Sequence, residues 1–284
     1  MNRMSDHHSA YLLSLPTAHA LPLVVDSPHS GTQYPTDFEV AVPRELLRRA
    51  EDTHVDKLYA SVPRVGGTLI AAQFPRAYID PNRHLEDIDE ALLDEPWPGA
   101  VSPSRKTELG IGLVWRMLGP LPMYTRPLTV AEVQGRIERC WQPYHRALDA
   151  ALHEAASAGT ARWHLNVHSM PDDAYQRLGM GEKKLADFVL GNLDDTTCDE
   201  ATMATIEQAL LGHGYTVARN DPFKGVEIIR RSGQPQRGWH SLQIEVKRSL
   251  YMDERFEPHE GFDRVRAAID SALEALAGHI RQQL

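Results

Sequence analysis

The 284-residue sequence is poor in cysteine: it has only Cys140 and Cys198, with no CxxC spacing. This scarcity argues against a disulfide framework and suits a reducing compartment such as the cytoplasm. Long hydrophobic runs are also missing, because the uncharged apolar stretches fall far short of the roughly 20 residues that a membrane-spanning helix needs. The first 20 residues lack a basic segment followed by an unbroken apolar one, so we expect neither an export signal nor a membrane partner.

Positive charge is scarce as well. The chain has 30 Lys and Arg against 39 Asp and Glu, so its formal net charge is −9, and its isoelectric point lies near 5.9. Binding to nucleic acid depends on Lys and Arg side chains that displace counterions from phosphates. We therefore expect no nucleic-acid partner and a small molecule as the ligand. The sequence does not indicate an oligomeric state.

What the chain does contain is enough apolar material for a large core, since 42% of its residues are hydrophobic. Short apolar runs alternate with helical patterns, which is typical of layered α/β folds. Such folds often reach about 250 residues in one unit, so we expect residues 1–284 to form a single catalytic domain. The predicted strands are 21–25, 67–74, 77–80, 163–169, 186–191, 214–218 and 240–246, and the predicted helices are 43–60, 129–157, 199–213 and 260–283.

Two local signals refine this outline. Thr129 and Glu132 have the spacing of a capping box, which predicts the start of the helix at 129. Residues 84–127 combine prolines, glycines and acidic side chains without a long periodic pattern. We expect them to form a loop insertion over the functional site.

Two histidines follow predicted strands in the same way. His29 comes after "LPLVV", within "SPHSG", and His168 lies at the end of "WHLNVHS". Open α/β sheets place their ligand sites at the carboxyl ends of strands. One imidazole in such a place could be a hydrogen-bonded structural group, but a matched pair favours a metal site.

A catalytic zinc ion usually has three protein ligands, so a third is needed. The candidates lie in "EDTHVDK", where Asp52, His54 and Asp56 recur at every second residue. In a helix Asp52 and Asp56 would share a face while His54 would point elsewhere, so only some of them can bind one ion. A solvated acidic helix start would explain the same residues. A His/Asp/His set suits Zn²⁺.

Glu245 lies in a predicted strand between the apolar residues Ile244 and Val246. A carboxylate is costly to bury there unless it is paired or functional. Burial would raise its pKa, as is needed by a base that takes a proton from metal-bound water and returns it to a leaving amine. The alternative is a glutamate that faces solvent from an edge strand.

Several cationic side chains could recognise an anion. Arg83, in "FPRAYIDPNRH", is a natural anchor for a substrate carboxylate, because a guanidinium offers paired donors. Lys224, Arg230 and Arg231, in "NDPFKGVEIIRRSG", form a second basic group in an acidic protein. This group indicates either an anion pocket or ordinary surface ion pairs.

Six segments, in order, resemble the N-formylglutamate amidohydrolase family over residues 21–255: "SPHSG", "EDTHVDKLY", "YIDPNR", "NVHSMP", "NDPFKGVEIIRRSG" and "HSLQIEVKRSLYMDE". The "DPNR" segment is also similar to the Asn-Arg pair of zinc carboxypeptidases and aspartoacylases. The resemblance implies a three-layer α/β/α fold with a mixed central sheet, of the phosphorylase/hydrolase-like type related to zinc carboxypeptidases. It also implies a zinc-dependent hydrolysis of the formyl amide of an N-formyl amino acid such as N-formyl-L-glutamate.

The resemblance further implies roles for particular residues. His29 and His168 would bind Zn²⁺, or another divalent ion in its place, and Glu245 would be the general base. Thr32 stands where the carboxypeptidase pattern has a glutamate ligand, so we assign Asp52 as the third ligand, with His54 as the alternative. The implied substrate contacts are the carboxylate clamp of Asn82 and Arg83, with Lys224 and Arg230 near the substrate. Arg76 would be either an oxyanion donor or a group that supports the metal ligands from outside.

Other functions remain open from the sequence. The substrate could be another N-acyl amino acid or a small peptide, and residues 86–116 resemble one branch of the family, so the accepted side chain need not be that of glutamate. A non-catalytic protein that binds an anionic metabolite is a further alternative. A serine hydrolase is disfavoured, because Ser30 and Ser169 lie in no GxSxG motif and each points away from the histidine before it.

Overall fold

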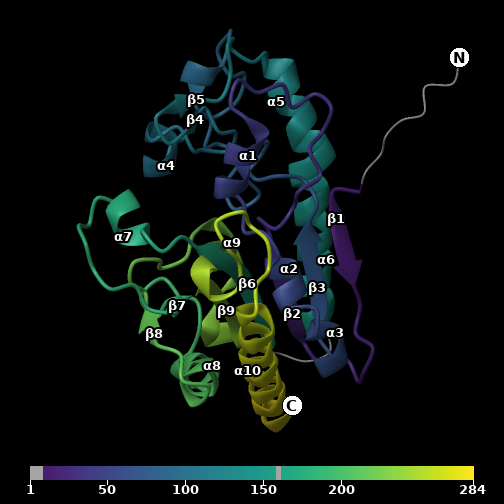
Figure 1. Cartoon of the computed structure of the whole chain (residues 1–284). Helices are drawn as coiled ribbons and strands as arrows, with labels where there is room; N and C mark the ends of the chain where they lie inside the picture. The colour runs from purple at the N-terminus through teal and green to yellow at the C-terminus, as the bar shows by residue number, and fades with distance from the viewer. Residues whose placement is uncertain (1–8, 158–160) are drawn as a thin grey trace, which may run out of the picture.

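A mixed seven-stranded sheet, in the order β1-β3-β2-β6-β9-β7-β8, forms the centre of the computed structural model, which describes residues 9–157 and 161–284 (Figure 1). Strands β3, β2, β6 and β9 are parallel neighbours, and β7 and β8 are parallel to each other. By contrast, β1 pairs with β3, and β7 with β9, in antiparallel fashion. The strands are β1 (Tyr11–Ser14), β2 (Leu23–Ser27), β3 (Thr68–Ala72), β6 (Arg162–Met170), β7 (Phe188–Gly191), β8 (Val217–Arg219) and β9 (Trp239–Lys247).

Helices cover both faces of this sheet, because successive strand residues send apolar side chains to opposite sides. On one face the core joins the strands to α2 (Val55–Leu58), α3 (Val62–Val65), α8 (Glu200–Gly212) and α10 (Gly261–Gln283). On the other it joins them to α1 (Arg44–Leu47), α5 (Val130–Arg136), the π-helical turn Ile137–Trp141, α6 (Gln142–Ser157) and α9 (Glu227–Ser232). The sheet and its two helical layers confirm the predicted fold class.

The predicted long helices form as the sequence indicates. The capping box before α5 is present: the Glu132 amide donates to the Thr129 hydroxyl at 3.1 Å, and the Glu132 carboxylate accepts the Thr129 amide at 2.7 Å. The side chain of Asp199 caps α8 by accepting the Thr202 amide at 3.0 Å. These bonds satisfy amides that the first helical turn leaves without a backbone partner.

The predicted helix over 43–60 is broken, and the break matters for the site. The chain leaves the helical path after the short 3-10 helix Arg48–Ala50, and His54 adopts a left-handed conformation with φ 68° before α2 begins. The amide of Asp52 instead donates to the carbonyl of His29 at 3.0 Å. Asp52 therefore lies in a loop beside His29 rather than on a helix face shared with Asp56.

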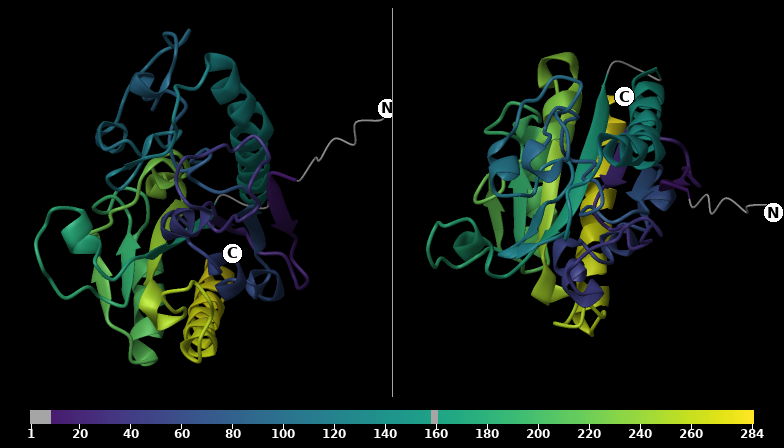
Figure 2. Two further views of the ribbon diagram at one scale, coloured as in Figure 1. Left: turned by 45° about the horizontal axis from the view of Figure 1, so that its top comes forward. Right: turned by 90° about the horizontal axis from the view of Figure 1, so that it is seen from above.

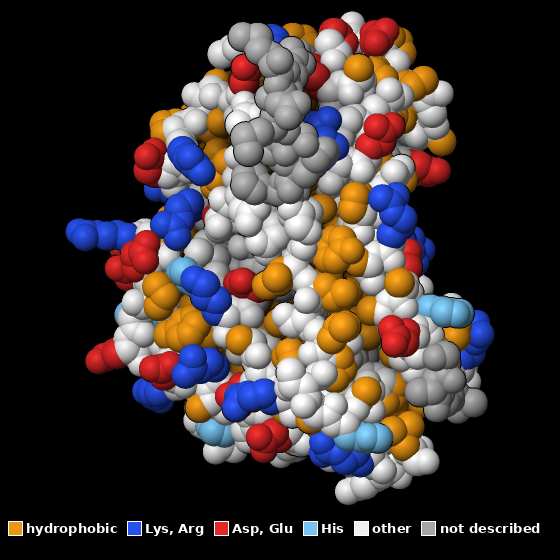
Figure 3. Space-filling view, turned by 90° about the vertical axis from the view of Figure 1, so that its right-hand side faces the viewer, with side chains coloured by type: hydrophobic (Ala, Val, Ile, Leu, Met, Phe, Trp, Pro, Cys, Tyr) orange, Lys and Arg blue, Asp and Glu red, His pale blue; other side chains and the backbone are white. Residues whose placement is uncertain are grey.

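Two further expectations about strands differ from the structure. Residues 77–80 form no strand, because the chain turns at residues 76–78, where the Tyr78 amide donates to the Pro75 carbonyl at 3.0 Å. Tyr78 and Ile79 are nevertheless buried, so their apolar pattern reflects packing under α5 and α6 rather than strand pairing. The edge strand β1 was not predicted from the sequence. Figure 3 shows the side of the molecule on which β1 lies, with hydrophobic side chains exposed between charged ones.

The segment 84–127 lies at one end of the molecule, where Figure 2 (left) shows it in blue and teal at the top. It contains only short elements, namely a 3-10 helix at Glu90–Leu92, α4 (Arg105–Glu108), β4 (Met117–Leu118) and β5 (Leu121–Pro122). Its Ile111 and Trp115 line the cavity described below. Across residues 9–157 and 161–284, no helix has both the length and the apolar character that crossing a bilayer requires.

Candidate active site

Polar side chains occupy one face of two central parallel strands, β6 and β9. The register pairs Asn166 with Gln243 and His168 with Glu245, and residues two apart along a strand point to the same side. His29 follows the neighbouring strand β2 at the same edge. Strand periodicity and register therefore bring residues more than 200 positions apart to one place at the carboxyl edge of the sheet.

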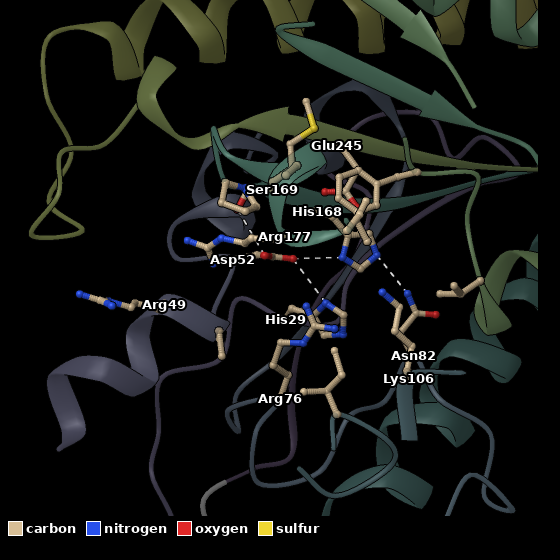
Figure 4. Close-up of a pocket in the computed structure, with 18 of the residues that line it drawn as sticks. His29, Arg49, Asp52, Arg76, Asn82, Lys106, His168, Ser169, Arg177 and Glu245 are labelled. Atoms are coloured by element: carbon tan, nitrogen blue, oxygen red, sulfur yellow. Dashed lines mark hydrogen bonds and ion pairs between the residues drawn. The ribbon is translucent and has the colours of Figure 1, made fainter. Parts of the chain in front are cut away.

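At this edge three buried side chains converge, as Figure 4 shows. The Oδ2 atom of Asp52 lies 3.0 Å from Nδ1 of His168 and 3.4 Å from Nδ1 of His29. His29 Nδ1 is buried and has no hydrogen-bond partner among the described residues. Two imidazole nitrogens and one carboxylate oxygen at such distances form a donor set that suits Zn²⁺.

The same geometry distinguishes Asp52 from His54, the other candidate for the third metal ligand. The ring of His54 points away, with Nε2 lying 3.0 Å from the carbonyl oxygen of Phe256 and Nδ1 lying 3.2 Å from the Lys57 ammonium. His54 is not part of the group that could hold a metal ion. The left-handed turn at His54 directs its side chain out of the site, so the structure favours Asp52.

A second set of side chains holds these three groups in place. The Nε2 atom of His29 lies 2.8 Å from Asp80 Oδ1, and Nε2 of His168 lies 2.7 Å from Asn166 Oδ1. When these Nε2 atoms carry the protons, the two Nδ1 atoms are the nitrogens left to bind a metal ion. Without an ion, Nδ1 of His29 has no hydrogen-bond partner among the described residues, whereas Nδ1 of His168 contacts Asp52. The other oxygen of Asp52 accepts hydrogen bonds from Arg248 at 3.0 Å and from Ser169 at 3.3 Å.

These positioning residues were not assigned from the sequence. Asn166 could have been found because it precedes His168 by two residues on the same strand, and Asp80 because it begins the "DPNR" segment. Arg248 follows β9 by one residue, but no local pattern indicates that it contacts Asp52.

Burial and neighbouring side chains determine the protonation of the candidate metal ligands Asp52 and His168. Burial alone would raise the pKa of Asp52, but the hydrogen bond with His168, the nearby imidazole of His29 and the charge of Arg248 hold it well below its usual value. Burial lowers the pKa of His168, and the hydrogen bond to Asp52 only partly opposes this effect. An ionised carboxylate and a neutral imidazole are the forms that bind a metal ion.

Glu245 is buried on a central strand, between β6 and β7, so it is not an edge residue that faces water. Its Oε1 atom accepts a hydrogen bond of 3.0 Å from Gln243. Burial raises the pKa of Glu245 well above its usual value, and the Asp52 carboxylate raises it further, although Arg76 opposes the shift. A carboxyl group with a raised pKa can accept a proton and then return it.

The predicted substrate-binding residues fall into two groups. Arg76, Asn82 and Arg83 line a cavity of about 260 Å³, together with His29, Asp52, His168 and Glu245. Lys224 and Arg230 do not line it, because their side chains are exposed and pair with Asp194 and Glu227, at 2.7 Å each. Their positive charges are therefore neutralised in ion pairs at the surface. From the same segment, Phe223 and Val226 line the cavity instead.

The hydrogen bonds that the cavity side chains make within the protein show which of their donors remain free to bind a substrate. Arg76 forms a two-bond ion pair with Asp80, at 2.8 and 3.2 Å. Asn82 is largely engaged, since its amide nitrogen donates to Asn166 at 3.3 Å and its oxygen accepts the Ile228 amide at 3.1 Å. Arg83 donates through Nε and Nη1 to backbone carbonyls. Its Nη2 has no partner among residues 9–157 and 161–284 nearer than Asp80, at 3.8 Å.

Lys106 is a cavity residue to which the sequence analysis gave no role. It comes from α4 in the segment 84–127 and lines the same space as Arg83 and Glu245. No hydrogen bond or ion pair joins its ammonium group to another described residue. Arg49 and Arg177 lie at the exposed rim, and Figure 4 shows Arg49 directed away from His29.

Fold and site together define an α/β protein with a candidate metal-binding active site. Residues 21–252 match the family described as N-formylglutamate amidohydrolase, so the chain belongs to the N-formylglutamate amidohydrolase family. The crystal structure of N-formylglutamate amidohydrolase from Ralstonia eutropha JMP134 is 51% identical to the chain. It superimposes with a TM-score of 0.96, and the match covers 98% of this chain and 100% of that one.

Two curated proteins extend the likeness beyond that structure. The chain is 26% identical to the N-formylglutamate deformylase of Pseudomonas aeruginosa, over 93% of this chain and 95% of the relative. It is 27% identical to the N-formylglutamate deformylase of Pseudomonas putida, over 82% and 83% of the two chains. The family match over residues 21–252 includes all the cavity residues discussed above.

Proposed function

We propose that the protein is a metal-dependent amidohydrolase that releases formate from an N-formyl amino acid, with N-formyl-L-glutamate as the leading substrate. The observation that carries this proposal is the convergence of His29, Asp52 and His168 beside the buried Glu245, in one small cavity of a family member. Zn²⁺ is the leading cofactor, because two imidazoles and one carboxylate suit it, and another divalent ion is the alternative.

His29, Asp52 and His168 would hold the ion through Nδ1, Oδ2 and Nδ1. A bound Zn²⁺ would supply Lewis acidity, which lowers the pKa of water from 15.7 toward about 7 and polarises a carbonyl group. Asp80, Asn166 and Arg248 keep the three donor atoms aimed at one point. Such outer contacts reduce the reorganisation that binding requires.

Glu245 is proposed as the general base and acid. It accepts a proton from the water that attacks the formyl carbon, and it then returns that proton to the amine nitrogen as the C–N bond breaks. The products are formate and the free amino acid. Gln243 donates to one oxygen of Glu245 and keeps the carboxyl group in its orientation on β9.

Arg76 and Arg83 are proposed to handle the negative charges of the reaction. Arg76 would donate to the oxyanion that develops on the formyl oxygen, which is worth roughly 3 to 4 kcal/mol for comparable donors. Arg83 would bind the α-carboxylate of the substrate through its free Nη2 donors, and Asn82 lies next to it in the chain. Holding that carboxylate fixes the scissile amide near Glu245.

The setting of this reaction is also a proposal. The partner would be a small anionic N-acyl amino acid, which suits a cavity of about 260 Å³ better than a polymer would. A cytoplasmic location is supported by Cys140 and Cys198, which are buried free thiols.

The function is tested by assaying the purified protein for formate release and for bound metal together. We expect about one metal ion per chain, turnover of N-formyl-L-glutamate, and little turnover of N-acetyl-L-glutamate, N-succinyl amino acids or small peptides. Removal of the metal by a chelator should abolish turnover, and added Zn²⁺ should restore it. A protein without stoichiometric metal or turnover would instead be a non-catalytic binder, and preference for the acetyl substrate would make it a different deacylase.

The contact of Asn166 with His168 gives a further prediction. Asn166→Ala should weaken zinc binding about 10- to 100-fold, because the imidazole loses the partner that sets its tautomer. Competition with a chromophoric chelator measures this affinity. Ser241→Ala is the matched control, since Ser241 lies on the same buried face of the sheet and bonds His164 rather than a candidate ligand. Equal affinities in the two variants would contradict a positioning role for Asn166.

A further inference from the structure

Among the described residues, the cavity has one half-buried cationic side chain without a carboxylate partner. Among the described residues, Arg76 pairs with Asp80, Arg248 pairs with Asp52, and the ammonium of Lys106 has no carboxylate within 4.0 Å. Lys106 is nevertheless half-buried and lines the cavity (Figure 4). An ammonium group without a partner is costly to withdraw from water, so its position calls for an anionic ligand.

The fold holds Lys106 in this position through the fully buried Asp87. Its carboxylate accepts the Ser104 amide at 2.6 Å and the Ser104 hydroxyl at 3.0 Å, and it also bonds the Thr107 hydroxyl. The hydroxyl of Ser104 in turn caps α4 by accepting the Lys106 amide at 3.1 Å. Asp87 also lies 3.9 Å from Arg83, so one carboxylate ties the segment that carries Lys106 to the proposed α-carboxylate anchor.

Positive charges surround Lys106 in the free protein. Burial, together with the charges of Arg83 and Arg76, lowers the pKa of Lys106 to about 8, and the more favourable charges of Asp80 and Glu245 do not compensate. On its own helix, Arg105 and Glu108 pair with each other and do not neutralise it. An anion bound between Lys106 and Arg83 would relieve this repulsion.

A substrate with two carboxylates would require two cationic side chains in the cavity. The α-carboxylate is assigned to Arg83, and Arg76 is assigned to the oxyanion, so a second carboxylate needs another cation inside the cavity. We propose that Lys106 binds the side-chain carboxylate of the N-formyl amino acid and so determines specificity for an acidic substrate such as N-formyl-L-glutamate. This inference rests on the proposed function and adds to it the residue that selects the side chain.

The test compares N-formyl-L-glutamate with N-formyl-L-glutamine, which has the same shape and α-carboxylate but no side-chain charge. We expect the wild type to prefer the glutamate substrate, and Lys106→Met to reduce the ratio of the two kcat/KM values about 10- to 100-fold, mainly through KM, as expected for one charge-assisted bond. Lys106→Arg should keep most of the preference. Lys184→Met, which removes an exposed lysine outside this cavity, should leave the ratio unchanged.

The pH dependence of the same ratio is an independent measurement. The lysine is charged below its pKa and neutral above it, so the wild-type preference for the glutamate substrate should decline as the pH rises through about 8. The Lys106→Arg enzyme should retain its preference there, because a guanidinium stays charged. Titration of Glu245 affects both substrates and cancels in the ratio.

The outcomes separate this proposal from the proposed function. If the wild type releases no formate from either substrate, the proposed function fails. If it does release formate but Lys106→Met lowers both kcat/KM values equally, or if the wild type prefers N-formyl-L-glutamine, the specificity role of Lys106 is overturned while the amidohydrolase function stands.

Discussion

Replacement of Glu245 by glutamine should lower kcat about 100- to 10,000-fold while the protein keeps its metal, because this range is typical for the loss of a general base. The amide of glutamine has nearly the same shape as the carboxyl group and remains close to Gln243, but it cannot accept the proton of the attacking water. The ion's proposed ligands, His29, Asp52 and His168, are untouched. Steady-state formate release and metal content per chain, measured on the same preparation, check both parts of the prediction.

A matched control uses another buried glutamate. Glu51 is only 1% exposed, bonds Tyr34 and does not line the cavity, so Glu51→Gln should leave turnover close to that of the wild type. Turnover of Glu245→Gln within a few-fold of the wild type would remove Glu245 from the mechanism. Loss of metal in the same variant would instead give Glu245 a part in holding the ion.

Replacement of Asp52 by alanine should abolish both stoichiometric metal binding and turnover. In the group of described residues that could hold the ion, its carboxylate is the anionic donor beside the two imidazoles, so the loss of affinity should exceed the 10- to 100-fold typical of an outer contact. Zinc titration of the metal-free variant by calorimetry measures the effect. Circular dichroism shows whether the fold survives, since the variant also leaves Arg248 without its partner.

His54→Ala is the control that distinguishes the two candidate third ligands. His54 bonds the Phe256 carbonyl outside the metal-site group, so this variant should bind zinc and turn over substrate as the wild type does. The opposite pattern, with metal lost in His54→Ala and kept in Asp52→Ala, would overturn the assignment of Asp52.

Short-range sequence patterns predicted the features that depend on local geometry, namely a helix start and the facing of strand residues. The capping box of Thr129 and Glu132 forms as expected, and strand periodicity alone places His168 and Asn166 on one side of β6. Glu245 was a candidate for either a buried base or a solvent-facing edge residue. The order of the sheet excludes the edge position, because β9 is flanked by β6 and β7, and the role of base stays a proposal.

Local sequence patterns did not predict which basic side chains line the cavity. Arg83 and Lys224 are both cationic candidates in the sequence, yet Arg83 lines the cavity and Lys224 pairs with Asp194 at the surface. Lys106 has no motif around it and reaches the cavity only because Asp87 folds its segment back onto the site. Ion pairing and access to a cavity depend on residues distant in sequence, so local spacing carries no information about them.

By itself, the sequence determined the mixed α/β class, the family and the two strand-end histidines, because hydrophobic periodicity and ordered motifs are properties of the chain. Only the tertiary structure decided that Asp52 rather than His54 joins those histidines, and that Lys106 rather than Lys224 enters the cavity. The physical reason is that one left-handed residue and a few long-range hydrogen bonds set the direction of these side chains, and both arise only when the strands and loops pack together.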